Sequence, residues 1–256
     1  MRDQCKANNL PRPWFLNSIP KSGTNLLIQA FSGFPNIRHH PADTFFDPYD
    51  YAASFYRLGQ LSNGHFGVGH IYYSQEWSRM LRRLQMKQVF LIRDLRDVLV
   101  SLVEFIVNKP EYHTMHPLRS YLLEHGSTNL ERIHLLMNGI QDDEMHYPDL
   151  VSWASSFLGW LYDSNTLVVK YEDLVRNQAS RTQTLARMVR YLVDEDLSTR
   201  KLREIVQAME DSIDPSTCGT FRKGVIGDWR THIPSEDAEA FTKSIHPLLT
   251  EFGYED

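Results

Sequence analysis

The chain has 256 residues, a net charge of -5 at pH 7, 42% hydrophobic residues and 23% charged residues. These values are typical of a globular domain that buries a core, and they argue against a general nucleic-acid binder, which is usually basic overall. No apolar run approaches the about 20 residues of a membrane span, and Cys5 and Cys218 lie too far apart in sequence to suggest a disulfide framework.

The polar N-terminal stretch MRDQCKANNLPRP contains two prolines and does not resemble a signal peptide. Together with the sparse cysteines, it predicts a cytoplasmic protein that meets its substrate in solution. The sequence allows a homodimer but does not determine the oligomeric state.

Short apolar or β-branched runs at 14–19, 65–71, 87–93 and 166–171 predict buried parallel strands. Helices are predicted at 24–31, 75–84, 96–107, 149–161 and 182–192. This alternation predicts an α/β fold, in which helices flank a central parallel sheet on both faces in a single domain over residues 1–256. Residues 109–147 are harder to assign, and we expect either a lid or a substrate-facing insertion there.

A tight polar turn joins the first predicted strand to the first predicted helix. A helix start attracts anions, Gly23 lets the backbone approach a ligand, and Lys21 adds a positive charge. An ordinary helix cap beside an exposed lysine would produce the same local pattern. The turn is not a Walker A motif, because its lysine precedes the glycine and no glycine lies upstream. Its residues are Pro20, Lys21, Ser22, Gly23, Thr24 and Asn25.

The predicted strand at 87–93 ends in Arg93, where a metal-dependent nucleotide site would carry an acidic Mg²⁺ ligand. Ser101 follows about two helical turns later and could share an anion with the guanidinium. Alternatively, Arg93 forms a surface ion pair with Asp94 or Asp97, and Ser101 bonds its own helix. An anion bound without a metal is the reading that we favour.

A third cationic segment, FRKGVIGDWR, lies near the C-terminus. Arg222 and Lys223 stand beside the flexible Gly224, and arginine can grip a phosphate through two hydrogen bonds. A turn at 227–229 is expected to hold this loop against the domain. A merely solvated charged loop is the alternative, but three such cationic segments together favour an anion site.

These segments carry a family resemblance. PKSGTN, RDLRDVLVS and FRKGVIGDW resemble the nucleotide-binding segments of sulfotransferases that use 3′-phosphoadenosine 5′-phosphosulfate (PAPS), and VVKYEDL resembles a strand end of their cytosolic branch. The matches run in the expected order from residue 20 to 229. The resemblance implies a P-loop-like fold, PAPS as co-substrate, PAP as product and no metal.

By this resemblance, one group of residues holds the 5′-phosphosulfate: Lys21, Ser22, Gly23, Thr24 and Asn25. A second group holds the 3′-phosphate: Arg93, Ser101, Arg222, Lys223 and Gly224. Tyr171 and Phe221 are expected near the adenine. The sequence departs from the family in two places. Asn25-Leu26 replaces an aromatic position, and VGHIYY keeps His70 without the threonine and proline of the family's THLP-like segment, with Val68 in place of a lysine.

His70 is the predicted general base, because it matches the family position and follows an apolar strand. Lys21 is predicted to stabilise charge on the bridging oxygen. Glu104, three residues after Ser101, is the alternative base or a substrate contact, and a solvated helix carboxylate is the alternative to both. His113 and His116 could suggest a metal pair, but a third ligand at suitable spacing is missing, so no metal site is expected.

The stretch 39–56 mixes aromatic residues with Asp43, Asp47 and Asp50. It predicts contact with a small, polar, nitrogen-containing acceptor, although a packed aromatic cluster ringed by surface acids would give the same pattern. Sulfonate transfer from PAPS to a hydroxyl or amine is therefore the leading hypothesis. A nucleotide kinase with a degenerate P-loop and an inactive PAP-binding module are the alternatives.

Overall fold

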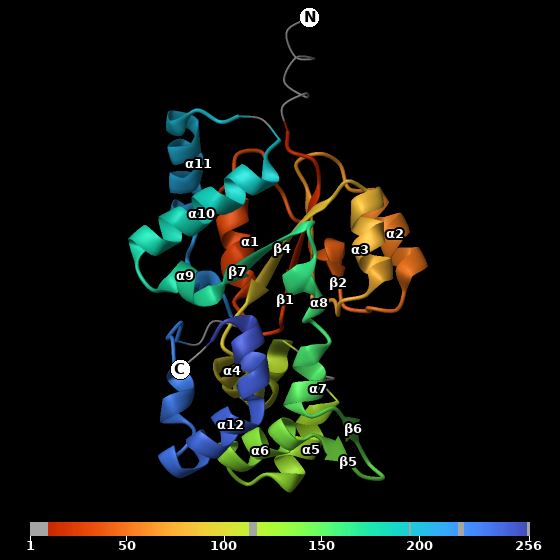
Figure 1. The fold of residues 1–256 in the computed structure, drawn as a ribbon, viewed down its shortest axis with the longest axis vertical. Helices are drawn as coiled ribbons and strands as arrows, with labels where there is room; N and C mark the ends of the chain where they lie inside the picture. The colour runs from red at the N-terminus through yellow and green to blue at the C-terminus, as the bar shows by residue number, and fades with distance from the viewer. Residues whose placement is uncertain (1–9, 113–116, 195, 220–222, 255–256) are drawn as a thin grey trace, which may run out of the picture.

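The computed structural model describes residues 10–112, 117–194, 196–219 and 223–254. Within these residues a five-stranded sheet has the order β2-β3-β1-β4-β7, and each neighbouring pair is parallel (Figure 1). Its strands are β1 (Trp14–Ser18), β2 (Thr44–Phe45), β3 (Phe66–Gly69), β4 (Lys87–Ile92) and β7 (Thr166–Lys170).

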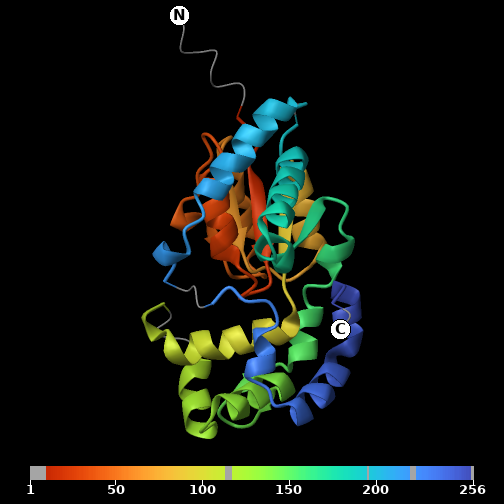
Figure 2. The same cartoon turned by 90° about the vertical axis from the view of Figure 1, so that its left-hand side faces the viewer.

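Both faces of the sheet are apolar and covered by helices. Alternate side chains of β1 enter opposite cores: Trp14 and Leu16 pack on one side, and Phe15 packs on the other. One face carries α1 (Thr24–Ser32), α10 (Gln178–Leu192) and α11 (Thr199–Asp211), and the other carries α2 (Tyr51–Gly59) and α3 (Gln75–Arg83) (Figures 1 and 2). The predicted α/β fold is confirmed, and burial on both faces explains why its strands read as continuous apolar runs.

A second group of helices lies below the sheet in Figure 1. It comprises α4 (Leu95–Asn108), α5 (Leu118–His125), α6 (Asn129–Asn138), α7 (Leu150–Ser155) and α12 (Ser235–Phe252). Both α5 and α6 pack against α4, and a short hairpin of β5 (Ile140–Gln141) and β6 (His146–Tyr147) follows them. The segment 109–147 is thus largely helical, and its role as a lid or substrate-facing insertion stays a prediction.

The predicted helix at 149–161 is two helices, α7 and α8 (Gly159–Tyr162). The carbonyl oxygen of Ser156 accepts the backbone N–H of Tyr73 at 2.8 Å, while the N–H of Trp160 bonds to Phe157 instead. Gly159 also faces the ring of Tyr73 so closely that a Cβ atom would lie 2.1 Å from it. A contact from a distant segment therefore breaks the helix, and local periodicity does not reveal it.

The remaining α-helix of the described residues is α9 (Tyr171–Val175), which directly continues β7. Among the residues that the structure describes, none of the helices combines the length and the apolar character needed to cross a bilayer.

The main strands end at a common edge of the sheet. β1 runs into the turn before α1, β3 into His70, β4 into Arg93 and β7 into Tyr171. Because β1 lies between β3 and β4, the chain reverses its direction of winding there. Ligands of open parallel sheets bind outside the carboxyl ends of the strands at such a point.

Candidate active site

The turn between β1 and α1 has a left-handed backbone at two residues. Lys21 has a φ of 70° and Gly23 a φ of 98°. A Cβ atom on Gly23 would lie 2.6 Å from Cδ2 of Tyr171, so glycine is required by both backbone conformation and space. The left-handed conformation of a lysine costs on the order of 1 kcal/mol, and such strain collects at functional sites.

Hydroxyl groups of this turn face different surroundings. Ser22 is fully buried, and its Oγ has no hydrogen-bond partner among the described residues. A buried hydroxyl without a partner costs about 1–3 kcal/mol, so a bound polar group would stabilise it. Thr24 is the first residue of α1, its Oγ1 lies 2.7 Å from Oγ of Ser18, and the helix has no side-chain cap. An uncapped helix start suits an anion.

The ammonium group of Lys21 lies against an aromatic ring. Its Nζ is 3.6 Å from the ring centroid of Phe105 on α4. A cation–π contact of this kind is worth roughly 0.5–2 kcal/mol. The charge therefore lies between the β1–α1 turn and α4, where a bound anion would compete with the ring.

The imidazole of His70 is tied to the end of the neighbouring strand. Its Nδ1 lies 3.0 Å from the carbonyl oxygen of Ser18 and 3.1 Å from the Oγ of the same residue. Because a carbonyl oxygen only accepts, the neutral ring carries its hydrogen on Nδ1 and its lone pair on Nε2. Burial lowers the pKa of His70, the hydrogen bond to the Ser18 carbonyl opposes this, and the charge of Lys21 lowers it further. The ring is thus held neutral, with Nε2 as the basic atom.

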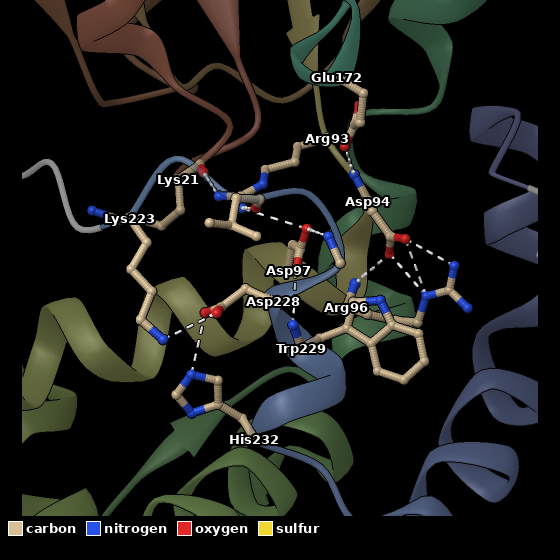
Figure 3. Close-up of polar contacts among 12 residues, drawn as sticks. Lys21, Arg93, Asp94, Arg96, Asp97, Glu172, Lys223, Asp228, Trp229 and His232 are labelled. Carbon is tan, nitrogen blue, oxygen red and sulfur yellow. Dashed lines mark hydrogen bonds and ion pairs between the residues drawn. The ribbon is translucent and has the colours of Figure 1, made fainter. Parts of the chain in front are cut away.

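Arg93 joins three segments at this edge (Figure 3). It is 7% exposed, and it donates to the carbonyl oxygens of Lys21 at 3.4 Å and Val225 at 3.0 Å. Its Nη2 lies 3.4 Å from Oδ2 of Asp97, and its guanidinium carbon lies 4.5 Å from the ring centroid of Tyr171. The Nε of Arg93 is buried and has no partner among the described residues. One donor of this cation therefore remains for a ligand.

Asp97 fastens the C-terminal loop, a role that the sequence did not reveal. Its carboxylate accepts the backbone N–H groups of Gly227 and Trp229, both at 2.9 Å, besides pairing with Arg93 (Figure 3). The alternative ion pair of Arg93 is therefore present, but it is buried and not on the surface. The only available signal was the spacing, which places Asp97 one helical turn after Arg93. Asp94 pairs with Arg96 instead, at 2.8 Å.

The loop at 223–229 is held as the sequence predicted. Lys223 is half exposed, and its Nζ lies 3.1 Å from Oδ1 of Asp228. The other carboxylate oxygen of Asp228, Oδ2, lies 3.2 Å from Nε2 of His232. Gly224 and Gly227 have left-handed backbones, with φ of 67° and 73°. The predicted contacts of Phe221 and Arg222 lie outside the described residues.

Other predicted site residues have more ordinary surroundings. Ser101 is half-buried on α4, and Asn25 is exposed in the first turn of α1. The carboxylate of Glu104 accepts the side-chain amides of Asn108, at 2.8 Å, and of Asn129 on α6. Glu104 therefore links α4 to α6, while the turn at 20–25, His70, Arg93 and Tyr171 share the sheet edge. Among residues missed from the sequence, Ser18 contacts both His70 and Thr24.

The family model described as the sulfotransferase domain matches residues 11–253. The chain belongs to the sulfotransferase family. This sulfotransferase is 25% identical over 261 aligned residues to Sulfotransferase 2A6 of Mus musculus, a match that covers 92% of the chain and 83% of the relative. It is 30% identical over 110 residues to Sulfotransferase 6B1 of Danio rerio, covering 39% of the chain and 37% of the relative.

Solved structures show the same fold. A mouse sulfotransferase, SULT7A1, complexed with PAP has a TM-score of 0.61 at 20% identity, over 91% of this sulfotransferase and 84% of that chain. Retinol dehydratase in a complex with retinol and PAP has a TM-score of 0.60 at 16% identity, and the match covers 95% of this sulfotransferase and 83% of that chain. The predicted enzyme class, a PAPS-dependent sulfotransferase, is confirmed.

Proposed function

We propose that the enzyme transfers the sulfonate group of PAPS to a hydroxyl or amine of a small-molecule acceptor, with His70 as general base and Lys21 stabilising the leaving phosphate. The observation that carries this proposal is the position of His70. Its Nδ1 is tied to Ser18 beside the β1–α1 turn, which leaves the lone pair of Nε2 for the acceptor's proton, and the charge of Lys21 acts on the ring.

The polar atoms of the site fit a ligand with two anionic groups. Ser22 Oγ and Arg93 Nε are buried donors without partners in the described part of the chain. Ser22 belongs to the β1–α1 turn, and Arg93 donates from the end of β4 to the carbonyl oxygen of Lys21 in that turn. The residues proposed for the 5′-phosphosulfate are Lys21, Ser22, Gly23, Thr24 and Asn25. Those proposed for the 3′-phosphate are Arg93, Ser101, Arg222, Lys223 and Gly224, with Tyr171 and Phe221 near the adenine.

Bound PAPS would supply the sulfonate group and a phosphate leaving group. The acceptor's proton goes to Nε2 of His70, and the Nδ1–H bonded to Ser18 stabilises the imidazolium that forms. Lys21 leaves the ring of Phe105 and places its charge near the oxygen that becomes negative. As in phosphoryl transfer, positioning and electrostatics then account for most of the rate enhancement.

Glu104 is the second candidate for the base. Its carboxylate accepts amide N–H groups from both Asn108 and Asn129, and these bonds hold it in the contact between α4 and α6. In the described residues, the hydrogen bonds of His70 are made by Nδ1, and none is made by Nε2. A Glu104→Gln variant keeps one acceptor oxygen, and we expect it to retain most of the activity if His70 is the base.

The surface near His70 is aromatic. The ring of Phe46, which is 68% exposed, lies 5.9 Å from the imidazole ring, and Tyr49 is also exposed. Asp47 and Asp50 accept backbone N–H groups in the turn and at the start of α2. Aromatic faces therefore meet the acceptor more readily than these carboxylates. A polar, nitrogen-containing acceptor stays a prediction, and the retinol and androsterone bound to retinol dehydratase represent the neutral alternative.

The test is transfer of label from PAPS to a panel of amines, phenols and alcohols, together with PAP binding by calorimetry in the presence of a chelator. We expect metal-independent PAP binding and turnover with one acceptor class. Tight PAP binding without turnover would favour a binding module, and protection by ATP-Mg²⁺ but not by PAP would favour a kinase. Preference for neutral acceptors would exclude the nitrogen-containing class of acceptor.

The predicted cytoplasmic location and homodimer stay predictions.

A further inference from the structure

A chain of three side chains connects the β3 end to the start of α1. Nδ1 of His70 lies 3.1 Å from Oγ of Ser18, and that Oγ lies 2.7 Å from Oγ1 of Thr24. Ser18 is fully buried at the last position of β1, between the strands that precede His70 and Arg93. Its hydroxyl therefore bridges the imidazole and the first residue of the anion-binding helix.

The roles of donor and acceptor in this chain follow from the acceptor-only carbonyl. The Nδ1–H of His70 points at the carbonyl oxygen and the Oγ of Ser18, so Ser18 Oγ accepts. The hydrogen of the Ser18 hydroxyl is then available for Thr24 Oγ1. Where Ser18 donates, Thr24 accepts and keeps its own hydrogen for another acceptor; either hydroxyl can donate in this pair, because Ser18 Oγ has two lone pairs. In both arrangements Ser18 Oγ accepts from His70 and contacts Thr24.

We propose that Ser18 is a positioning residue that orients His70 and Thr24 together, so that the base and a donor of the β1–α1 turn are set by a single buried hydroxyl. This inference rests on the proposed function, in which His70 is the base and the turn holds the phosphosulfate. No proton moves along the chain. The acceptor's proton ends on Nε2, the bond from the acceptor to sulfur forms as the bond from sulfur to the phosphate oxygen breaks, and Nδ1 keeps its hydrogen.

The effect of removing the hydroxyl has a defined sign. Ser18 Oγ stabilises the imidazolium as an extra acceptor for Nδ1–H, so Ser18→Ala lowers the pKa of His70 further and makes Nε2 a weaker base. The charge of Lys21, from the β1–α1 turn, lowers the pKa of the ring. No carboxylate of the described residues is hydrogen-bonded to the imidazole, so the hydroxyl has no charged substitute. The strand itself should persist, because the Ser18 carbonyl remains.

The experiment measures kcat, KM, PAP affinity and the pH profile for the parent, Ser18→Ala, Ser18→Cys and Ser18→Thr. We expect kcat to fall about tenfold in the alanine and cysteine variants, as the loss of one aligned hydrogen bond implies. PAP affinity should stay within about twofold, and the acid limb of kcat/KM should move to lower pH. Threonine restores the hydroxyl and should restore both kcat and the acid limb.

Two controls separate this role from general destabilisation. Ser78→Ala removes another buried serine hydroxyl, on α3 and hydrogen-bonded to Asp163 away from the site, and should leave kcat unchanged. A double-mutant cycle of Ser18→Ala with Thr24→Val should show losses in kcat that do not add, because either substitution breaks the same chain. If Ser18→Ala fails to fold, Ser18→Cys provides the same comparison at nearly the same side-chain volume.

An NMR titration measures the pKa of the His70 ring, and so tests its contact with Ser18 without relying on turnover. We expect a lower pKa of the His70 ring in Ser18→Ala than in the parent, with PAP bound in both. A Ser18→Ala enzyme with the parent's kcat, acid limb and ring pKa would overturn the inference. If His70→Ala kept full turnover, the proposed base would be wrong. If His70→Ala lost turnover while Ser18→Ala kept it, only the role of Ser18 would be wrong.

Discussion

The β1–α1 joint and the β4–α4 joint follow the same strand–turn–helix plan, but their polar groups are satisfied differently. At the first joint, Ser22 Oγ is buried without a partner in the described residues and α1 begins without a side-chain cap. At the second joint, the Asp94 side chain caps α4 and binds Arg96, and Asp97 binds Arg93 and the loop at 227–229, so that Arg93 Nε alone of these groups lacks a partner in the described residues.

This difference indicates that the first joint serves binding and chemistry, whereas the second joint mainly stabilises the fold. Donors without partners gain stability from a ligand, so the first joint is suited to bind and react. Charges already paired in the interior hold segments in place, and removing one partner leaves the other uncompensated. We therefore expect substitutions at the first joint to reduce kcat with little loss of stability, and substitutions at the second joint to do the reverse.

His70→Ala should have the largest effect on rate. Loss of a general base lowers kcat by about 10²–10⁴-fold, while PAP affinity and the unfolding midpoint should change little. His65→Ala is the matched control, because its Nδ1 also lies near a backbone carbonyl, that of Ser62 at 3.3 Å, at the opposite end of β3 from His70. Steady-state kinetics and thermal unfolding make the comparison. Unchanged kcat in His70→Ala would transfer the role of base to Glu104.

Lys21→Ala should lower kcat by about 10²–10³-fold, because it removes the charge that stabilises the leaving phosphate. It also removes the contact with Phe105, worth roughly 0.5–2 kcal/mol, while the left-handed backbone stays, so stability should fall only modestly. Lys87→Ala is the control, since Lys87 also lies near an aromatic ring, that of Tyr191, but away from the sheet edge that binds the ligand. Single-turnover rates at saturating PAPS measure the effect, and equal rates for both variants would contradict the assignment.

Asp97→Asn tests the holding role of the second joint. Asparagine cannot accept both backbone N–H groups as a carboxylate does, and Arg93 loses its buried counter-charge. We expect the free energy of unfolding to fall by about 3 kcal/mol. PAP should stabilise the variant more than the parent, because a phosphate replaces the missing charge beside Arg93. Urea unfolding with and without PAP measures both effects.

The control for this prediction is Asp194→Asn, which removes an exposed ion pair with Lys87 and should cost less than about 1 kcal/mol. Equal losses of stability in the two variants would show that Asp97 does not hold the joint. A large fall in kcat at saturating PAPS in Asp97→Asn, without loss of stability, would break the proposed division between the joints.

Glu172→Gln should have the smallest effect. Burial raises the pKa of Glu172 above its ordinary 4.5, although the hydroxyl of Tyr254 donates to its carboxylate at 2.6 Å. The folded state then binds more protons than the unfolded state above pH 4.5, so this group lowers stability as pH rises toward its folded pKa. The stability of the variant relative to the parent should rise over that range in urea unfolding. A constant difference between pH 4 and 8 would contradict the raised pKa.

Several features could be read from local sequence. The apolar runs of β1 and β4 predicted buried strands, because strands covered on both faces need no polar alternation. The capping box of Thr128 and Glu131 was equally readable, since a threonine three residues before a glutamate marks a helix start, yet α6 was not predicted. The short β2 escaped notice because its pairing with β3 covers only two residues.

The sequence by itself determined the class of fold, the family and the residues at the strand ends, because hydrophobic runs and short motifs are local properties of the chain. Only the tertiary structure decided which polar atoms have partners. The bridge from His70 through Ser18 to Thr24 spans 52 residues, and the bonds from Asp97 to the C-terminal loop span more than 100. Such contacts depend on strand order, which brings distant segments to one sheet edge and is not encoded in any single segment.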